Sequence, residues 1–375
     1  MSTIFEYLDW RGDVPFDADP FNDVDNIVLA ELAYSEFDGI VPEDGTQISL
    51  SEVCEAFFTT HTREELIEDD NPIAKAPLLM DGMLSGGRFG SMMVSDYVNI
   101  IDTERSLQFS AMTFWLSDGT AYIAYRGTDS TIVGWKEDFN MSYLPETGGQ
   151  REAIEYLNKV ASGLDIPIRV GGHSKGGNFA VYASAFCDSS IKDKILNVYS
   201  NDGPGFRSNV MEAEDYKSIL PKVISIVPDT SIIGMLLTSK VENHVVKSSA
   251  FGLMQHDCLT WQVARNRFES AELSELGQFI FKTQVDWLSK IDDNSRELFV
   301  NTLFSLFEST GMGTFGKMSD NKLKSAESII STLTGLPRER QKEMKRILRE
   351  LLSSSKETAK ESINDSLNDL ISDKK

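Results

Sequence analysis

The sequence predicts an α/β fold with a mostly parallel sheet flanked by helices, an N-terminal lead-in and a helical C-terminal extension. Three observations predict it. Between residues 86 and 263, short apolar runs of β type alternate with helical stretches, which is typical of a parallel sheet covered on both faces. Beyond Ala264 the β-type runs stop and amphipathic stretches follow. The chain has 375 residues, 41% of them hydrophobic, and can therefore bury a large core.

The lead-in, residues 1–85, is acidic, and we expect it to pack on the core. Its segment 23–37, DVDNIVLAELAYSEF, holds apolar residues at roughly helical spacing and predicts a helix. In the core, residues 86–263, strands are expected at 92–101, 111–116, 120–125, 166–172, 195–200 and 222–227, with a helix at 150–164. The C-terminal region, residues 264–375, predicts helices at 275–291, 294–310 and 337–354, and the Gly-rich stretch 310–321 separates the second from the third.

Composition excludes several classes of function. The net charge is -22, from 36 Lys and Arg against 58 Asp and Glu, which argues against binding of nucleic acid or of another acidic polymer. The N-terminal residues lack a basic region followed by an apolar one, and no apolar run approaches the roughly 18 residues of a membrane span. The three cysteines, Cys54, Cys187 and Cys258, form no CxxC pair. We therefore expect reduced thiols, no structural zinc and a cytoplasmic location.

The stretch IRVGGHSKGGNFAVYASAF, residues 168–186, changes from a β-type run to a helical one around a single serine. Residues 172–176 match G-x-S-x-G, in which a serine occupies a sharp turn between a strand and a helix, and glycines avoid collisions there. Ser174 is therefore the candidate nucleophile, and the backbone N–H of Lys175 would point toward an oxyanion formed at it. A phosphate-binding loop is the rival interpretation, but G-x-x-x-x-G-K-[ST] is absent.

A nucleophilic serine needs a base, and the chain has four histidines. His173 adjoins Ser174 and is assigned to holding the turn, and His61 precedes the whole sheet. In sites of this type the chain order is serine, acid, histidine, which leaves His244 and His256. We favour His256 because it follows the last strand-bearing segment.

The acid should follow a strand between the nucleophile and the base. Asp229 comes directly after the apolar run KVISIVP and is the first choice. Asp202, in YSNDGPGF, also follows a strand and stays open as the alternative. Asp257 is too close to His256 in sequence to orient its ring.

The segments IAYRGTDSTIVGWKEDFNMSY, GGHSKGGNFAVYAS, NDGPGF, ISIVPDTSII and QHDCLTW resemble those of class 3 lipases and of a bacterial family of uncharacterised α/β-hydrolase proteins related to them. The resemblance covers about residues 1 to 290. It implies an α/β-hydrolase fold with Thr128 in the oxyanion hole, Ser174 as nucleophile, Asp229 as acid and His256 as base. Two departures stand out: the segment 129–144, in the place of a lipase lid, is polar, and Lys175 replaces an apolar residue.

The sequence therefore predicts a cytoplasmic serine hydrolase that cleaves a carboxylic ester, of a small molecule or a lipid, through an acyl-enzyme. Thr128 and the N–H of Lys175 would form the oxyanion hole, and no cofactor is required. The alternative is a non-catalytic scaffold that binds a partner through its C-terminal helices. The helix at 337–354 has an apolar stripe and a locally basic face, so it would either contact an anionic membrane surface or pack on neighbouring helices.

Overall fold

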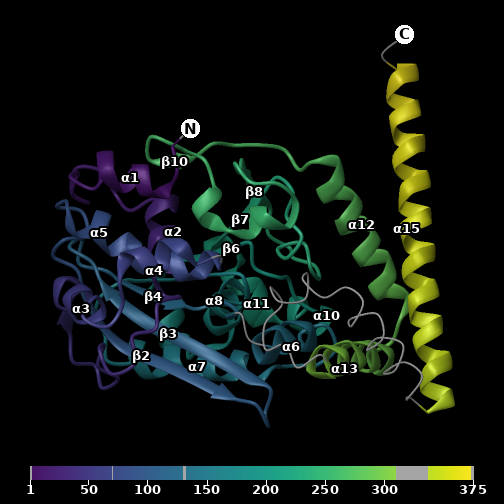
Figure 1. The fold of residues 1–375 in the computed structure, drawn as a ribbon, viewed down its shortest axis with the longest axis horizontal. Helices are drawn as coiled ribbons and strands as arrows, with labels where there is room; N and C mark the ends of the chain where they lie inside the picture. The colour runs from purple at the N-terminus through teal and green to yellow at the C-terminus, as the bar shows by residue number, and fades with distance from the viewer. Residues whose placement is uncertain (1, 70, 130–131, 310–336, 373–375) are drawn as a thin grey trace.

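The strands of the main sheet follow one another in space in the same order as in the chain. The computed structural model describes residues 2–69, 71–129, 132–309 and 337–372, and in them an eight-stranded sheet runs from β1 to β8 (Figure 1). The strands are β1 Ile48–Ser49, β2 Met93–Asp102, β3 Leu107–Trp115, β4 Ala121–Tyr125, β5 Ile168–His173, β6 Ile195–Asn201, β7 Val223–Pro228 and β8 Asn243–Val246. A separate hairpin pairs β9 Val263–Ala264 with β10 Arg267–Phe268.

Helices lie before, between and after these strands. In the N-terminal half they are α1 Ile4–Arg11, α2 Asp23–Leu32, α3 Leu50–Phe57, α4 Arg63–Glu68, α5 Leu79–Leu84, α6 Ile132–Asn140 and α7 Gly148–Ala161. The others are α8 Lys175–Phe186, α9 Ser189–Lys192, α10 Ser208–Met211, α11 Glu214–Ile219, α12 Glu275–Lys290, α13 Asp293–Ser309 and α15 Arg338–Ser372. Short 3-10 turns are η1 Pro72–Leu78, η2 Leu220–Lys222, η3 Gly252–His256 and η4 Cys258–Thr260.

The sheet combines an antiparallel half with a parallel half. Strands β1 to β4 pair antiparallel, whereas each pair from β4 to β8 is parallel. The carboxyl ends of β5, β6 and β7 therefore open at one edge of the sheet, which is where open α/β folds place their sites. This arrangement is an α/β-hydrolase fold, as expected.

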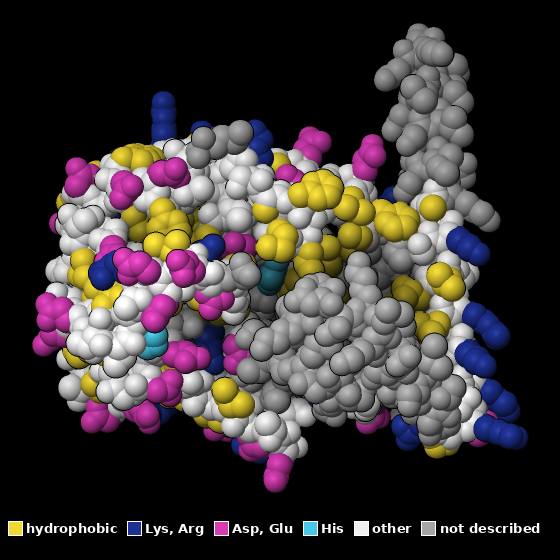
Figure 2. All heavy atoms as spheres, viewed as in Figure 1, with side chains coloured by type: hydrophobic (Ala, Val, Ile, Leu, Met, Phe, Trp, Pro, Cys, Tyr) yellow, Lys and Arg dark blue, Asp and Glu magenta, His cyan; other side chains and the backbone are white. Residues whose placement is uncertain are grey.

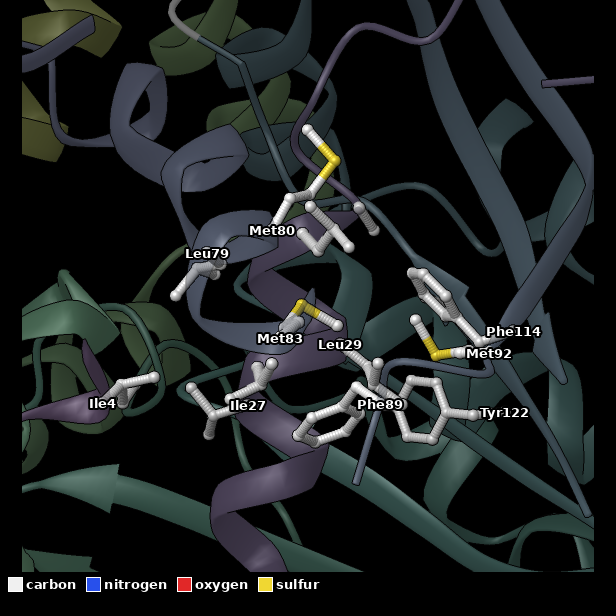
Figure 3. Close-up of a cluster of buried hydrophobic side chains, with 14 of the residues drawn as sticks. Ile4, Ile27, Leu29, Leu79, Met80, Met83, Phe89, Met92, Phe114 and Tyr122 are labelled. Carbon is white, nitrogen blue, oxygen red and sulfur yellow. The ribbon is translucent and has the colours of Figure 1, made fainter. Parts of the chain in front are cut away.

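Both faces of the sheet are buried, and strand β4 shows how. Its side chains alternate: Tyr122 and Ala124 belong to a cluster with the N-terminal helices, whereas Ile123 and Tyr125 belong to a cluster with α7 and α8. Figure 3 shows part of the first cluster, in which Tyr122 lies beside Phe89, Met92 and Phe114; the cluster also holds side chains from α1, α2 and α5. The lead-in thus covers much of one face, together with residues of the segment 258–268.

Helix α2 is the innermost element of the lead-in. The Asn22 side chain caps it by accepting from the N–H groups of Val24 and Asp25, and every residue from Val24 to Leu32 is buried. The helix predicted over 23–37 ends earlier, at Leu32. Because all sides of α2 are buried from Val24 to Leu32, the two carboxylates in that stretch must find partners inside the protein. Asp25 pairs with Arg88 at 2.5 Å, and Glu31 reaches the site described below.

The C-terminal helices form a separate group beside the sheet, with α15 as a long rod along its outer side (Figure 1). Met344 and Ile347 of α15 are buried against Ile291 and Leu298, whereas Leu352 is exposed. The helix runs to Ser372, beyond the predicted end at 354, and the Gly-rich stretch 310–321 lies outside the described residues. Within the described ranges, no helix has the length and apolar character to cross a membrane.

Candidate active site

Ser174 sits on a strained turn between β5 and α8. Its backbone has φ 57° and ψ -130°, a conformation that residues with a side chain rarely adopt. The Ser174 N–H donates to the carbonyl of Asn201 at 2.8 Å, which ties the turn to the end of β6. A Cβ on Gly172 or Gly176 would collide with the Tyr125 carbonyl oxygen. The two glycines thus let the backbone pack tightly enough to hold the serine in this turn.

The carboxylate that contacts His256 belongs to Asp202. His256 Nδ1 lies 2.6 Å from Asp202 Oδ2, and the Asp202 side chain is fully buried while that of His256 is 21% exposed. Asp202 Oδ1 also accepts from Ser231 Oγ at 2.5 Å and from the N–H of Gly234 at 3.2 Å. These contacts hold the carboxylate so that one oxygen faces the histidine.

The expectation that Asp229 orients His256 is corrected by this contact. Asp229 Oδ1 accepts instead from Thr230 Oγ1 at 2.9 Å and from Gln255 Nε2 at 3.0 Å. The reason is strand order: Asp202 follows β6, the neighbour of the strand that carries Ser174, whereas Asp229 follows β7, one strand further away. Asp229 reaches the residue before His256 and holds the histidine turn from outside.

His244 and His61 are placed apart from this carboxylate. His244 is exposed on β8, paired in register with Ile226 of β7. His61 stacks on Phe57 with ring centroids 4.3 Å apart. In the part of the chain that the structure describes, no hydrogen bond joins the Ser174 hydroxyl to His256. Such bonds are often long before substrate binds.

Thr128 lies on the loop that passes Ser174. A Cβ on the preceding Gly127 would be 3.0 Å from Ser174 Cβ, so this loop runs directly against the turn. Thr128 Oγ1 donates to Asp138 Oδ2 at 2.5 Å. Burial raises the pKa of Asp138 to about 7, although the charge of Lys175 and the Thr128 hydroxyl lower it. Lys175 is the first residue of α8, so its N–H lies at the positive end of the helix dipole.

The Lys175 side chain is fully buried. Its Nζ donates to the carbonyl oxygen of Gln108 at 3.1 Å, to the Oε1 of Gln108 at 2.5 Å, and to Glu137 Oε2 at 3.2 Å. Glu137 in turn accepts from the N–H of Gly149 at 2.7 Å. The sequence showed two departures from the lipase pattern: a lysine after the serine and a polar segment at 129–144. The structure connects them, because Lys175 pairs with Glu137 of α6, which lies in that segment.

Two residues of the site lie in the lead-in and were not expected from the sequence. Glu31 Oε1 lies 2.9 Å from His173 Nδ1, and Tyr34 Oη lies 3.1 Å from the same nitrogen. The His173 ring is packed against that of His256, with centroids 4.5 Å apart. A glutamate and a tyrosine at helical spacing carry no signal in a sequence, since this pattern is common on exposed helix faces.

Glu31, His173 and Cys258 are also the described residues whose ligand-type atoms gather within 4.8 Å of one another. At 2.9 Å, Glu31 Oε1 and His173 Nδ1 are within ion-pair distance of each other. Burial lowers the pKa of His173, but the charge and hydrogen bond of Glu31 outweigh it, so the pKa is raised.

The fold and the groups at the strand ends define the class: an α/β-hydrolase fold with a serine on the elbow and a histidine–aspartate pair beside it. The chain belongs to the Mbeg1-like family, whose model matches residues 83–305.

Two solved structures are similar to this chain. M37 lipase is 14% identical, with a TM-score of 0.36 over 56% of this chain and 68% of that one. The Rhizomucor miehei lipase propeptide complex is 15% identical, with a TM-score of 0.32 over 41% of this chain and 57% of that one. No curated protein matches the sequence at a significant level.

Proposed function

We propose that the protein is a serine hydrolase that cleaves a carboxylic ester through an acyl-enzyme, with Ser174, His256 and Asp202 as its triad. The observation that carries the proposal is the pairing of a strained serine elbow with a buried carboxylate 2.6 Å from His256 Nδ1. Because Nδ1 faces Asp202, the nitrogen left to act on the serine is Nε2, which is the division of roles that such triads use.

The chemistry then follows in two halves. His256 Nε2 takes the proton of the Ser174 hydroxyl while Oγ attacks the ester carbonyl, and Asp202 stabilises the imidazolium. The backbone N–H groups of Lys175 and Thr128 stabilise the oxyanion of the tetrahedral intermediate. His256 returns the proton to the departing alkoxide, and an acyl-enzyme remains. Water, activated by His256, attacks the acyl carbonyl, releases the carboxylic acid and restores Ser174.

An apolar rim next to the histidine supports an ester with an apolar part. Phe251, Leu253 and Met254 belong to the turn that ends at His256, and they are 83%, 55% and 57% exposed. Leu276 of α12 is also exposed. On the face drawn in Figure 2, hydrophobic side chains gather around one histidine, between the sheet and α12. An acyl chain or lipid leaving group would cover such side chains.

Labelling with a fluorophosphonate tests the proposal, since this probe phosphonylates an activated serine and needs no knowledge of the substrate. The wild type should be labelled and Ser174→Ala should not. Ser184→Ala is the matched control, because Ser184 is buried in α8 and its hydroxyl has no hydrogen-bond partner; it should label like the wild type. A folded wild type that resists the probe would support the scaffold instead.

A further inference from the structure

Helix α2 places the carboxylate of Glu31 beside the candidate active site, in contact with His173. Glu31 lies outside the segment 83–305 that the family model matches, yet its carboxylate contacts His173, the residue before the nucleophile, at 2.9 Å. Both side chains are almost fully buried, at 6% and 7% exposure. A buried carboxylate beside a buried imidazole is costly unless the two share a proton and a charge.

The His173 ring in turn supports the ring of His256. The ring centroids are 4.5 Å apart and the ring planes are tilted by 39°, so the two imidazoles are in direct contact. His256 is therefore held on one side by Asp202 at Nδ1 and across its face by His173. Tyr34 Oη, 3.1 Å from His173 Nδ1 and 3.3 Å from the His173 carbonyl oxygen, fixes the supporting ring.

We propose that Glu31 and His173 form a buried ion pair that positions the His256 ring and sets how readily it accepts a proton. The inference deepens the proposed function and rests on it, because it assigns two positioning residues to the same triad. Helix α2 then takes part in the chemistry as well as in covering the sheet.

The charges around His256 explain why such a pair is useful. During the reaction His256 becomes an imidazolium, and a second positive ring at 4.5 Å would oppose this step. The Glu31 carboxylate balances the positive ring of His173, so the pair as a whole is neutral. Burial lowers the pKa of His256 and the charge of His173 lowers it further, whereas the hydrogen bond and charge of Asp202 raise it.

The remaining titratable groups at the site come from the turn after His256. Burial, followed by the charge of Glu31, raises the pKa of Asp257 to about 6. Burial also raises the pKa of the Cys258 thiol, which stays neutral. Neither group contacts the His256 ring through a hydrogen bond in the described part of the chain. The pair of Glu31 and His173 is thus the charged group that lies against the face of the catalytic ring.

Three variants separate the effect of the pair from that of its members. His173→Gln removes a positive ring and leaves Glu31 negative, so His256 should titrate at higher pH. Glu31→Gln removes the carboxylate that keeps His173 charged. The His173 ring beside His256 then becomes neutral. In the double variant, which combines Glu31→Gln with His173→Gln, the groups beside His256 are neutral as well. The titration midpoint of His256 should therefore be nearly equal in Glu31→Gln and in the double variant, and highest in His173→Gln.

The midpoint is measured by NMR titration of the His256 ring in a Ser174→Ala background, where the result does not depend on catalysis. Asp25→Asn is the control: it breaks the buried pair of the same helix with Arg88 and should lower stability without moving the midpoint. Equal midpoints in His173→Gln and the parent protein would overturn the inference. If the variants do not fold, titration of His173 in the parent protein decides, because a midpoint below the ordinary histidine range would exclude the ion pair.

The activity of the same variants, measured with Ser174 restored, distinguishes the proposed ester hydrolase from the proposed ion pair. With a soluble p-nitrophenyl ester, the acidic limb of kcat/KM should move to higher pH in His173→Gln. Shifted midpoints without hydrolysis by the wild type would retain the ion pair and reject the ester hydrolase. Hydrolysis with an unmoved acidic limb would reject the ion pair and retain the hydrolase.

Discussion

Asp202 Oδ2 lies 2.6 Å from His256 Nδ1, and Asp229 contacts Gln255, the residue before that histidine. Two strand-end aspartates thus approach the same turn, and the one on the strand nearer to Ser174 holds the ring.

We expect Asp202→Asn to lower kcat for a soluble ester by a factor on the order of 10⁴, because an asparagine holds the wrong imidazole tautomer. Asp229→Asn should cost far less, since Asp229 touches Gln255 and Thr230 and not the ring. Steady-state kinetics of both variants measure the difference. A larger loss in Asp229→Asn would return the acid role to Asp229.

The strain at Ser174 predicts a gain in stability from glycine. At φ 57° a Cβ is unfavourable, so Ser174→Gly should raise the free energy of unfolding by about 1 kcal/mol relative to Ser174→Ala. Both variants lack the hydroxyl, so the comparison isolates the backbone. Urea unfolding gives the two values, and a less stable glycine variant would mean that the turn stores no strain.

Asp138 makes stability depend on pH. Its pKa is raised to about 7 from the ordinary value of 3.8 by burial, so the folded protein keeps a proton that the unfolded chain releases. Stability should therefore fall as pH rises from about 4 to about 7. Asp138→Asn stays neutral and can still accept from Thr128. Its advantage over wild type should grow across this window, by up to a few kcal/mol at about 1.4 kcal/mol per pKa unit. Denaturation series at several pH values would show it; a constant difference would contradict the assignment.

The buried pair of Lys175 and Glu137 should behave as a unit. Removing one partner, in Lys175→Met or Glu137→Gln, leaves the other group buried without its ionic partner and should cost about 3 kcal/mol or more. The double variant should lose clearly less than the sum. Arg63→Ala is the control, since its ion pair with Asp81 is exposed and should contribute little. Additive losses in the double variant would show that the two side chains do not depend on each other.

Most of the central sheet could be predicted because its strands are buried on both faces and appear as apolar runs. The run AMTFWL marks β3 and IPIRVGG marks β5. Strand β8, Asn243–Val246, was missed, since four residues with two polar ones at the edge of a sheet give no such signal. The tail helix extends beyond its predicted end, where Ser354 and Thr358 are buried and Glu357 pairs with Lys290 of α12 at 2.7 Å; these tertiary contacts could not be predicted from the sequence.

The sequence by itself determined the elbow, because glycines around a serine between a strand and a helix are a local pattern with a local steric reason. It also singled out His256 as the candidate base, by its place at the close of the strand-bearing region. Only the tertiary structure decided which of Asp202 and Asp229 contacts His256, since both follow strands and the contact depends on which strand adjoins β5. Glu31 is likewise a tertiary contribution: a helix from the lead-in must fold over the sheet before its carboxylate can meet His173.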